Sequence, residues 1–183
     1  MMYNNLKKEV NDVKKEIKKI SLSAIFSALI VVMLMLGTFI EVLDITVAAI
    51  CSLLIFTVQL EAKGKYPFLV FLTSSALALI FAPLSSATLY YIGFFGYYPI
   101  IKVLFEKCKK ITRKIICFLI FNTSMVILML IFKAVFALQN EPPVIYAALL
   151  ITLNIFFFCL DRLFDIFPLI YFKYLRSKIK FIK

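Results

Sequence analysis

The sequence predicts an all-α protein, a bundle of six transmembrane helices with both ends of the chain in the cytoplasm. Hydrophobic residues make up 63% of the chain, whereas a soluble domain has about 45–50% apolar residues. They gather in long runs that do not alternate with polar residues, such as IICFLIFNTSMVILMLIF. Such runs indicate helices, because a lipid bilayer cannot satisfy open backbone groups and barrel strands alternate polar with apolar residues.

Residues 1–20 are expected to form a basic, amphipathic segment in the cytoplasm. Its apolar residues recur at spacings of four and three, with lysines between them, so that one helical face is apolar. Three interpretations stay open: a helix that binds a partner, a helix held on anionic lipid, or a solvated lead-in that only sets topology. A secretory signal is not expected, because no small-residue cleavage site follows. The apolar residues are Leu6, Val10, Val13, Ile17 and Ile20.

The transmembrane domain is expected to cover residues 21–172. A spanning helix needs about 20 mostly apolar residues. The last candidate is too long for one straight crossing, so its inner end should continue into the cytoplasm, followed by a basic cytoplasmic tail at 173–183. The six predicted spans are 21–40, 44–60, 66–82, 86–105, 115–138 and 144–172.

The basic residues determine the predicted orientation. Apart from Lys133 and Arg162, every lysine and arginine lies at the N-terminus, in or beside the loops after the second and fourth spans, or in the tail. The three opposite loops contain none. Because basic loops stay in the cytoplasm, this pattern predicts cytoplasmic termini in a multi-pass protein of the cell membrane. The net charge of +11 is therefore typical of membrane flanks and does not indicate binding to nucleic acid.

The first span begins with two pairs of small residues at helical spacing. Ser23 and Ser27 form one pair, and Ala24 and Ala28 form the other. Small side chains allow helices to approach closely in lipid. Spacing alone favours packing within the chain's own bundle, and contact with a helix of another subunit is the alternative.

The fourth span carries four tyrosines in two pairs. Tyr90 and Tyr97 lie seven residues apart, as do Tyr91 and Tyr98, so each pair would share a face of an α-helix. They extend too far along the axis to lie at one membrane interface. A ring-lined pocket or a tight helix contact would explain them, and Pro99 favours a kink.

Polar residues within spans are functional candidates, because burying them in lipid is unfavourable. Lys133 is expected near the outer end of the fifth span, where it would either snorkel or bind an anionic group. Asn154 lies near the middle of the sixth span and Asn122 in the fifth, and either would alternatively bridge two helices.

A charged cluster lies towards the inner end of the sixth span. Asp161 and Asp165 share a helix face, and Arg162 would pair with either of them or with a neighbouring helix. We expect a structural or partner-docking role for these three residues.

The residue types argue against an enzyme. The chain has no histidine, the commonest general base and metal ligand. Its cysteines, Cys51, Cys108, Cys117 and Cys159, have neither zinc-binding nor disulfide spacing. There is no nucleotide-binding glycine loop. No catalytic residue, metal or cofactor is therefore expected.

The layout resembles the S component, the substrate-binding membrane subunit, of energy-coupling factor (ECF) transporters. The similarity lies in the six spans, the cytoplasmic ends and the length. The Ala24-x-x-x-Ala28 pair resembles that family's AxxxA motif, and FFGYYPIIK with Asp161 resembles uncharacterised S-component-like proteins of Gram-positive bacteria.

The resemblance implies a protein that is not an enzyme but captures a small, vitamin-like molecule outside the cell. Ala24 and Ala28 would contact a transmembrane coupling subunit, and two cytoplasmic ATPases would drive release inside. The alternative is a multi-pass scaffold, without transport activity, that recruits a cytoplasmic or lipid partner through its basic segments. The substrate-binding candidates implied by the resemblance are Glu41, Asp44, Tyr90, Tyr91, Lys133 and Asn154.

Overall fold

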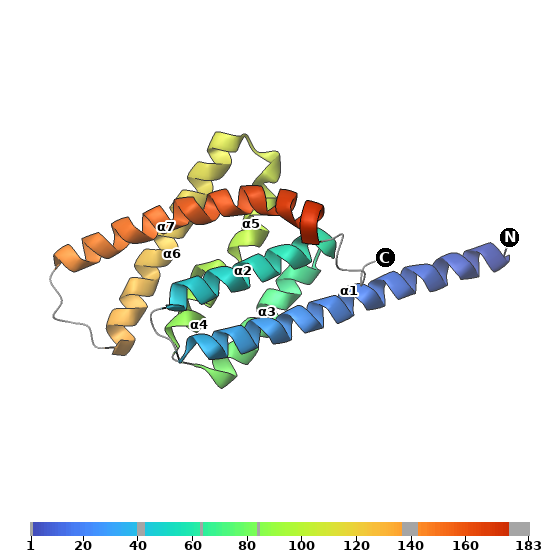
Figure 1. The fold of residues 1–183 in the computed structure, drawn as a ribbon, viewed down its shortest axis with the longest axis horizontal. Helices are drawn as coiled ribbons and strands as arrows, with labels where there is room; N and C mark the ends of the chain where they lie inside the picture. The colour runs from blue at the N-terminus through green and yellow to red at the C-terminus, as the bar shows by residue number, and fades with distance from the viewer. Residues whose placement is uncertain (1, 40–42, 63, 84, 137–142, 176–183) are drawn as a thin grey trace. The chain divides into compact units, whose positions relative to one another are not determined.

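The computed structural model describes residues 2–39, 43–62, 64–83, 85–136 and 143–175, and within these ranges the secondary structure is helical, without strands. The chain divides into two compact units, Met1–Cys108 and Lys109–Lys183 (Figure 1). Each unit is described by itself below.

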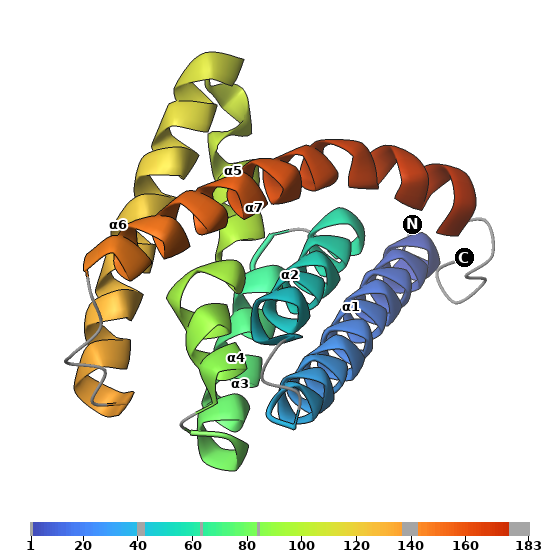
Figure 2. The ribbon, with the colours of Figure 1, turned by 60° about the vertical axis from the view of Figure 1, so that its left-hand side comes forward.

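The first unit is built around three long helices. Helix α1 (Met2–Gly37) packs against α2 (Asp44–Glu61) and α3 (Tyr66–Phe81), as Figures 1 and 2 both show. Helix α2 also contacts the segments that follow α3. These segments are α4 (Ser86–Tyr90), the π-helical turn η2 (Tyr91–Phe95) and α5 (Tyr98–Leu104), and the 3-10 turn η3 (Phe105–Lys107) follows α5.

Local sequence explains where two of these helices begin. Pro67 and Pro99 lie in the first turns of α3 and α5, where proline has no hydrogen bond to lose and its ring fixes a helical φ. Gly64 has a φ of 65° in the turn between α2 and α3. This left-handed conformation is open to glycine without a Cβ penalty. The predicted bounds 44–60 and 66–82 therefore lie within one residue of the observed helices.

The fourth predicted span is not one α-helix. In η2 the backbone N–H of Gly96 donates to the carbonyl oxygen of Tyr91 at 2.7 Å, five residues back. Such a wide turn holds one residue more than an α-helical turn. The seven-residue spacing between Tyr90 and Tyr97 therefore no longer corresponds to two α-helical turns, and the face-sharing expected from an unbroken helix does not apply.

The aromatic packing explains why a glycine follows the π turn directly. A Cβ on Gly96 would lie 2.5 Å from two carbons of the Phe71 ring, so only a residue without a side chain fits. The Phe71 ring also meets Tyr91 and Tyr97, with both centroid distances 6.0 Å. The ring of Phe94 lies 4.9 Å from that of Tyr98. The tyrosine-rich segment is therefore packed tightly against α3.

The second unit consists of α6 (Lys110–Phe136), α7 (Pro143–Ile170) and the π-helical turn η4 (Tyr171–Leu175). Stacked rings join α6 to α7: Phe121 and Phe157 have centroids 4.6 Å apart, and Phe118 and Phe158 have centroids 5.8 Å apart. Residue numbers rise along α6 while those of its contacts on α7 fall. The two helices are therefore antiparallel.

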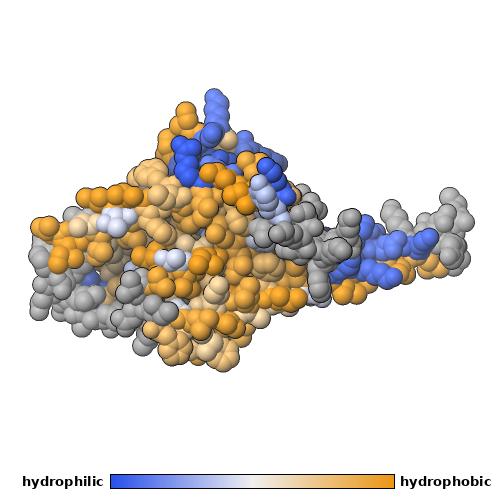
Figure 3. Space-filling model, in the orientation of Figure 1, coloured by the Kyte–Doolittle hydropathy of each residue, from blue (hydrophilic) through white to orange (hydrophobic). Residues whose placement is uncertain are grey.

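Three helices of the described part are long and apolar enough to cross a membrane, over Glu9–Gly37, Asp44–Glu61 and Lys110–Lys133. Many of their outward-facing side chains are large and apolar, and Figure 3 shows the hydrophobic colour over most of the visible helix surfaces. Such surfaces suit lipid rather than water. The predicted boundary at residue 20 lies inside α1, which continues unbroken from the basic segment into the first apolar stretch.

Candidate functional site

Two predicted ligand-binding residues of the first unit interact with each other. Asp44 is the first residue of α2 and is buried, and its carboxylate interacts electrostatically with the hydroxyl of Tyr90, the half-buried last residue of α4. The N-terminus of a helix favours a negative charge, which explains how this position holds a buried carboxylate. Asp44 and Tyr90 thus bring an acceptor and a phenol together where α2 begins.

Two hydroxyls on and beside α4 add to this polar region. Thr88 is fully buried and Ser85, which precedes α4, is partly buried. The hydroxyl oxygens of both have no hydrogen-bond partner among the described residues. A buried hydroxyl without a partner destabilises a protein by about 1–3 kcal/mol. Asp44, Ser85, Thr88 and Tyr90 lie at the start of α2 and on or beside α4, two helices that contact each other, and we call this set of residues the α2–α4 polar cluster.

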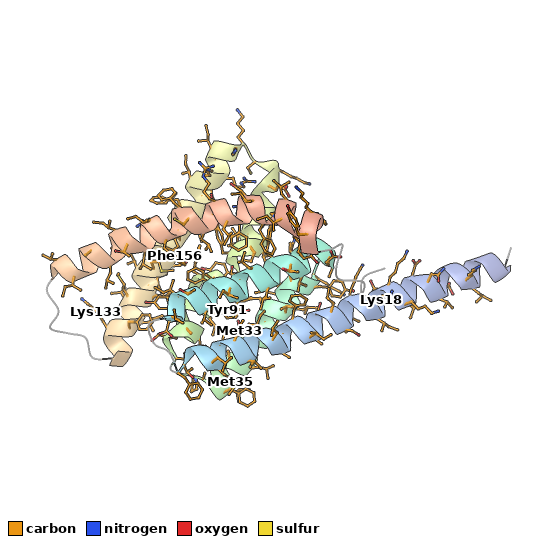
Figure 4. The ribbon with its side chains drawn as sticks, in the orientation of Figure 1. Lys18, Met33, Met35, Tyr91, Lys133 and Phe156 are labelled. Carbon is orange, nitrogen blue, oxygen red and sulfur yellow. The ribbon has the colours of Figure 1, made fainter. Side chains whose placement is uncertain are left out.

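Tyr91, another ligand-binding candidate, is sealed within the first unit. Its side chain is fully buried, and its hydroxyl lies 2.7 Å from the Oγ of Ser74 (Figure 4). Ser74 donates its own proton to the carbonyl oxygen of Val70 at 2.7 Å, so Tyr91 is the donor to Ser74. This geometry joins the π turn to α3 and leaves the Tyr91 hydroxyl engaged.

Asn154 forms a reciprocal amide pair with Asn122 in the second unit. Each Nδ2 donates to the Oδ1 of the other residue at 3.1 Å. Each Nδ2 also donates to a carbonyl oxygen of its own helix, Phe118 for Asn122 and Leu150 for Asn154. Of the two roles that the sequence left open for these asparagines, the geometry is that of a bridge between helices.

The two remaining charged residues predicted to bind a ligand are Lys133 and Glu41. Lys133 is half-buried in the last turn of α6, at the helix end that favours a cation (Figure 4). It belongs to the second unit, whereas the α2–α4 polar cluster belongs to the first. Glu41 lies outside the described residues.

The charged cluster of α7 has a partner that sequence reasoning missed. Arg113, at the start of α6, lies 3.7 Å from Asp165, while Asp161 is buried and Arg162 is exposed. The sequence assigned Arg113 to a loop, because the predicted span began at residue 115. Helix α6 begins earlier, at Lys110, which extends it far enough to carry Arg113 beside α7.

The two small-residue pairs of α1 lie on different faces. Ser23 and Ser27 are buried, and the Ser27 hydroxyl lies 3.0 Å from that of Thr73 on α3. Ala24 and Ala28 are exposed. The serine pair therefore packs inside the unit, whereas the alanine pair is open to another helix.

No three His, Cys, Asp or Glu side chains gather to hold a metal ion in the part of the chain that the structure describes. Comparisons with protein-family models, with curated proteins and with solved structures gave no match to this chain.

Proposed function

We propose that this chain is the membrane-embedded, substrate-binding subunit of an ECF-type importer, with six spans and cytoplasmic termini. The observation that carries the proposal is the α2–α4 polar cluster. A buried carboxylate, a half-buried phenol and a buried hydroxyl without a partner among the described residues lie at the predicted outer ends of two helices that contact each other. A buried hydroxyl without a partner, such as that of Thr88, is unfavourable in an apolar protein unless it binds something polar. A small polar molecule entering from outside would meet that need.

The exposed alanines of α1 support the coupling half of the proposal. A helix of a transmembrane coupling subunit can pack closely against α1 only where the side chains of α1 are small. Ala24 and Ala28 provide such a face, since they are exposed and the serine pair on the adjacent face is already packed against α3. The coupling subunit and two ATPases would supply the energy for uptake, because this chain has no nucleotide-binding motif.

The binding test uses the purified full-length chain and mass spectrometry of the small molecules that it retains. We expect Asp44→Asn and Thr88→Val to lose the retained molecule while the protein still inserts. Thr57→Val is the matched control for Thr88→Val, since the Thr57 hydroxyl is also buried but donates to its own helix at 2.9 Å. Retention unchanged by both cluster variants would contradict the proposed site.

The coupling test uses copurification from the native membrane. Ala24→Trp and Ala28→Trp should release a copurifying coupling subunit and its ATPases, because a close helix contact tolerates little added volume. Leu29→Trp is the control, since Leu29 is exposed but is neither three nor four residues from Ala24 or Ala28, and therefore lies on a different side of the helix. Other partners, captured in the absence of any ATPase, would favour the scaffold instead.

A further inference from the structure

We propose that the N-terminal half of α1 pairs with the same segment of a second copy of this chain, as a short, parallel, two-stranded coiled coil. The surface concerned is the α1 stripe, formed by the five apolar residues predicted to share a face. In Figure 3 polar residues cover much of this half of α1, with hydrophobic residues along one side. The stripe residues are Leu6, Val10, Val13, Ile17 and Ile20, each more than half exposed.

The spacing of the α1 stripe is that of a coiled-coil seam. Alternating steps of four and three residues average 3.5, the period that keeps one seam facing a partner along a left-handed supercoil. Val10 and Ile17 take the a positions of the heptad, and Leu6, Val13 and Ile20 take the d positions. The sequence LKKEVND followed by VKKEIKK repeats this pattern, including the same KKE triplet.

The charges beside the stripe identify the partner and its direction. Lys7 and Lys14 take the e positions, and Glu9 and Glu16 take the g positions. In a parallel pair a g residue lies beside the e residue of the next heptad on the other helix, so Glu9 meets Lys14 of the second copy. In an antiparallel pair, glutamates would face glutamates and lysines would face lysines. The chain is therefore complementary to itself only in the parallel direction.

Insertion into the same membrane places the N-terminal helices of two copies in the parallel direction. Two copies with the same topology present their N-terminal helices in parallel. At the cytoplasmic end of the predicted first span, the Lys19 ammonium lies 5.7 Å from the centre of the Tyr66 ring, and the Glu16 carboxylate interacts with the Tyr66 hydroxyl. These contacts tie α1 to α3 on a side next to the stripe. The stripe is left open.

The continuity of α1 argues against lipid as the occupant. The helix runs from Met2 to Gly37, and no glycine or proline precedes Gly37 in it. Sharp kinks arise at proline, at glycine or at inserted residues. A helix that crosses the bilayer without a kink carries residues 2–20 about 28 Å away from it, at 1.5 Å per residue. The stripe would then face a neighbouring protein rather than the membrane surface.

Only the a side of this face continues into the membrane. The next a position after Ile17 is Ala24, which is exposed, whereas the next d position, Ser27, packs against Thr73 of α3. Pairing of two copies and docking of the proposed coupling subunit would therefore use adjoining parts of one helix face. The two assemblies are expected to compete.

The test measures recovery of one tagged, full-length copy with a second, differently tagged copy from the same membranes. Glu9→Lys and Lys14→Glu should each lower recovery by about fivefold or more, because each places like charges side by side. Combining them in every copy restores opposite charges, so the double variant should recover the pairing. Lys15→Glu is the matched control: it makes the same charge change at an outward f position, where Lys15 is 3.9 Å from Asp12.

Three results would overturn the proposal. If lipid occupies the stripe, Glu9→Lys should strengthen binding to anionic phosphatidylglycerol vesicles, Lys14→Glu should weaken it, and neither should alter recovery of the second copy. Equal loss in Lys14→Glu and Lys15→Glu would show an unspecific charge effect.

Oxidative cross-linking gives a second measurement in a background without the four native cysteines. Val10→Cys should cross-link and Lys15→Cys should not, and the reverse would also refute the pairing.

Discussion

The Asn122–Asn154 pair gives a quantitative test of how α6 and α7 are held together. Each amide donates one hydrogen bond to the other at 3.1 Å. Hydrogen bonds between membrane helices contribute about 0.6 kcal/mol on average and up to about 1.7 kcal/mol. Two of them predict a coupling free energy of about 1–3 kcal/mol.

The single and double substitutions should behave differently. Asn122→Leu or Asn154→Leu alone leaves the partner's Oδ1 without its donor, although the partner's Nδ2 keeps its bond to its own helix. Removing both amides leaves neither group unpaired, so the double variant should lose less stability than the two singles added together. Reversible unfolding of the full chain in mixed micelles measures the four free energies of unfolding. Strictly additive losses would refute the bridge.

Three further predictions concern other parts of the chain. Gly96→Ala should lower the free energy of unfolding by about 1–3 kcal/mol, because the added methyl group overpacks against the Phe71 ring. Adding Phe71→Leu should reverse part of that loss. An unchanged unfolding midpoint in the single variant would contradict the packing. Lys133→Met should leave membrane insertion intact and weaken uptake of an anionic ligand more than uptake of its neutral amide. If the variant binds both forms as well as the wild type does, the lysine only snorkels. Topology reporters should be cytoplasmic near Gly64 and external near Asn140, and an external signal near Gly64 would exclude the six-span arrangement.

Helix positions could be predicted from the sequence where the local signals agreed. The apolar run of the third span predicted the bounds of α3 to within one residue, and the structure adds Gly64 and Pro67 as local signals at its start. The π turn was not predicted from the sequence, and the contact that accompanies it, the Phe71 ring against Gly96, joins residues that are distant in the sequence. Local propensity carries no information about such a contact.

The candidate site could be predicted only as a set of residue types. Small residues occupy adjacent faces of α1, so spacing alone could not decide which pair packs inside; the hydrogen bond from Ser27 to Thr73 decides it. The Asn122–Asn154 bridge needed the antiparallel register of α6 and α7, which single-helix patterns do not contain. The meeting of Asp44 with Tyr90 likewise depends on how α2 lies beside α4.

The unbroken α1 also has a mechanical consequence. Its 36 residues form one stiff rod of about 54 Å, at 1.5 Å per residue. Roughly half of that rod lies beyond the predicted membrane boundary, so in a membrane it would act as a lever that pivots near Tyr66, where Lys19 contacts α3. A change of about 10° in the tilt of the buried half would swing the free tip by about 5 Å. Because the two arms of the rod are about equal in length, a rocking movement in the lipid would reach the cytoplasmic end of α1 undiminished.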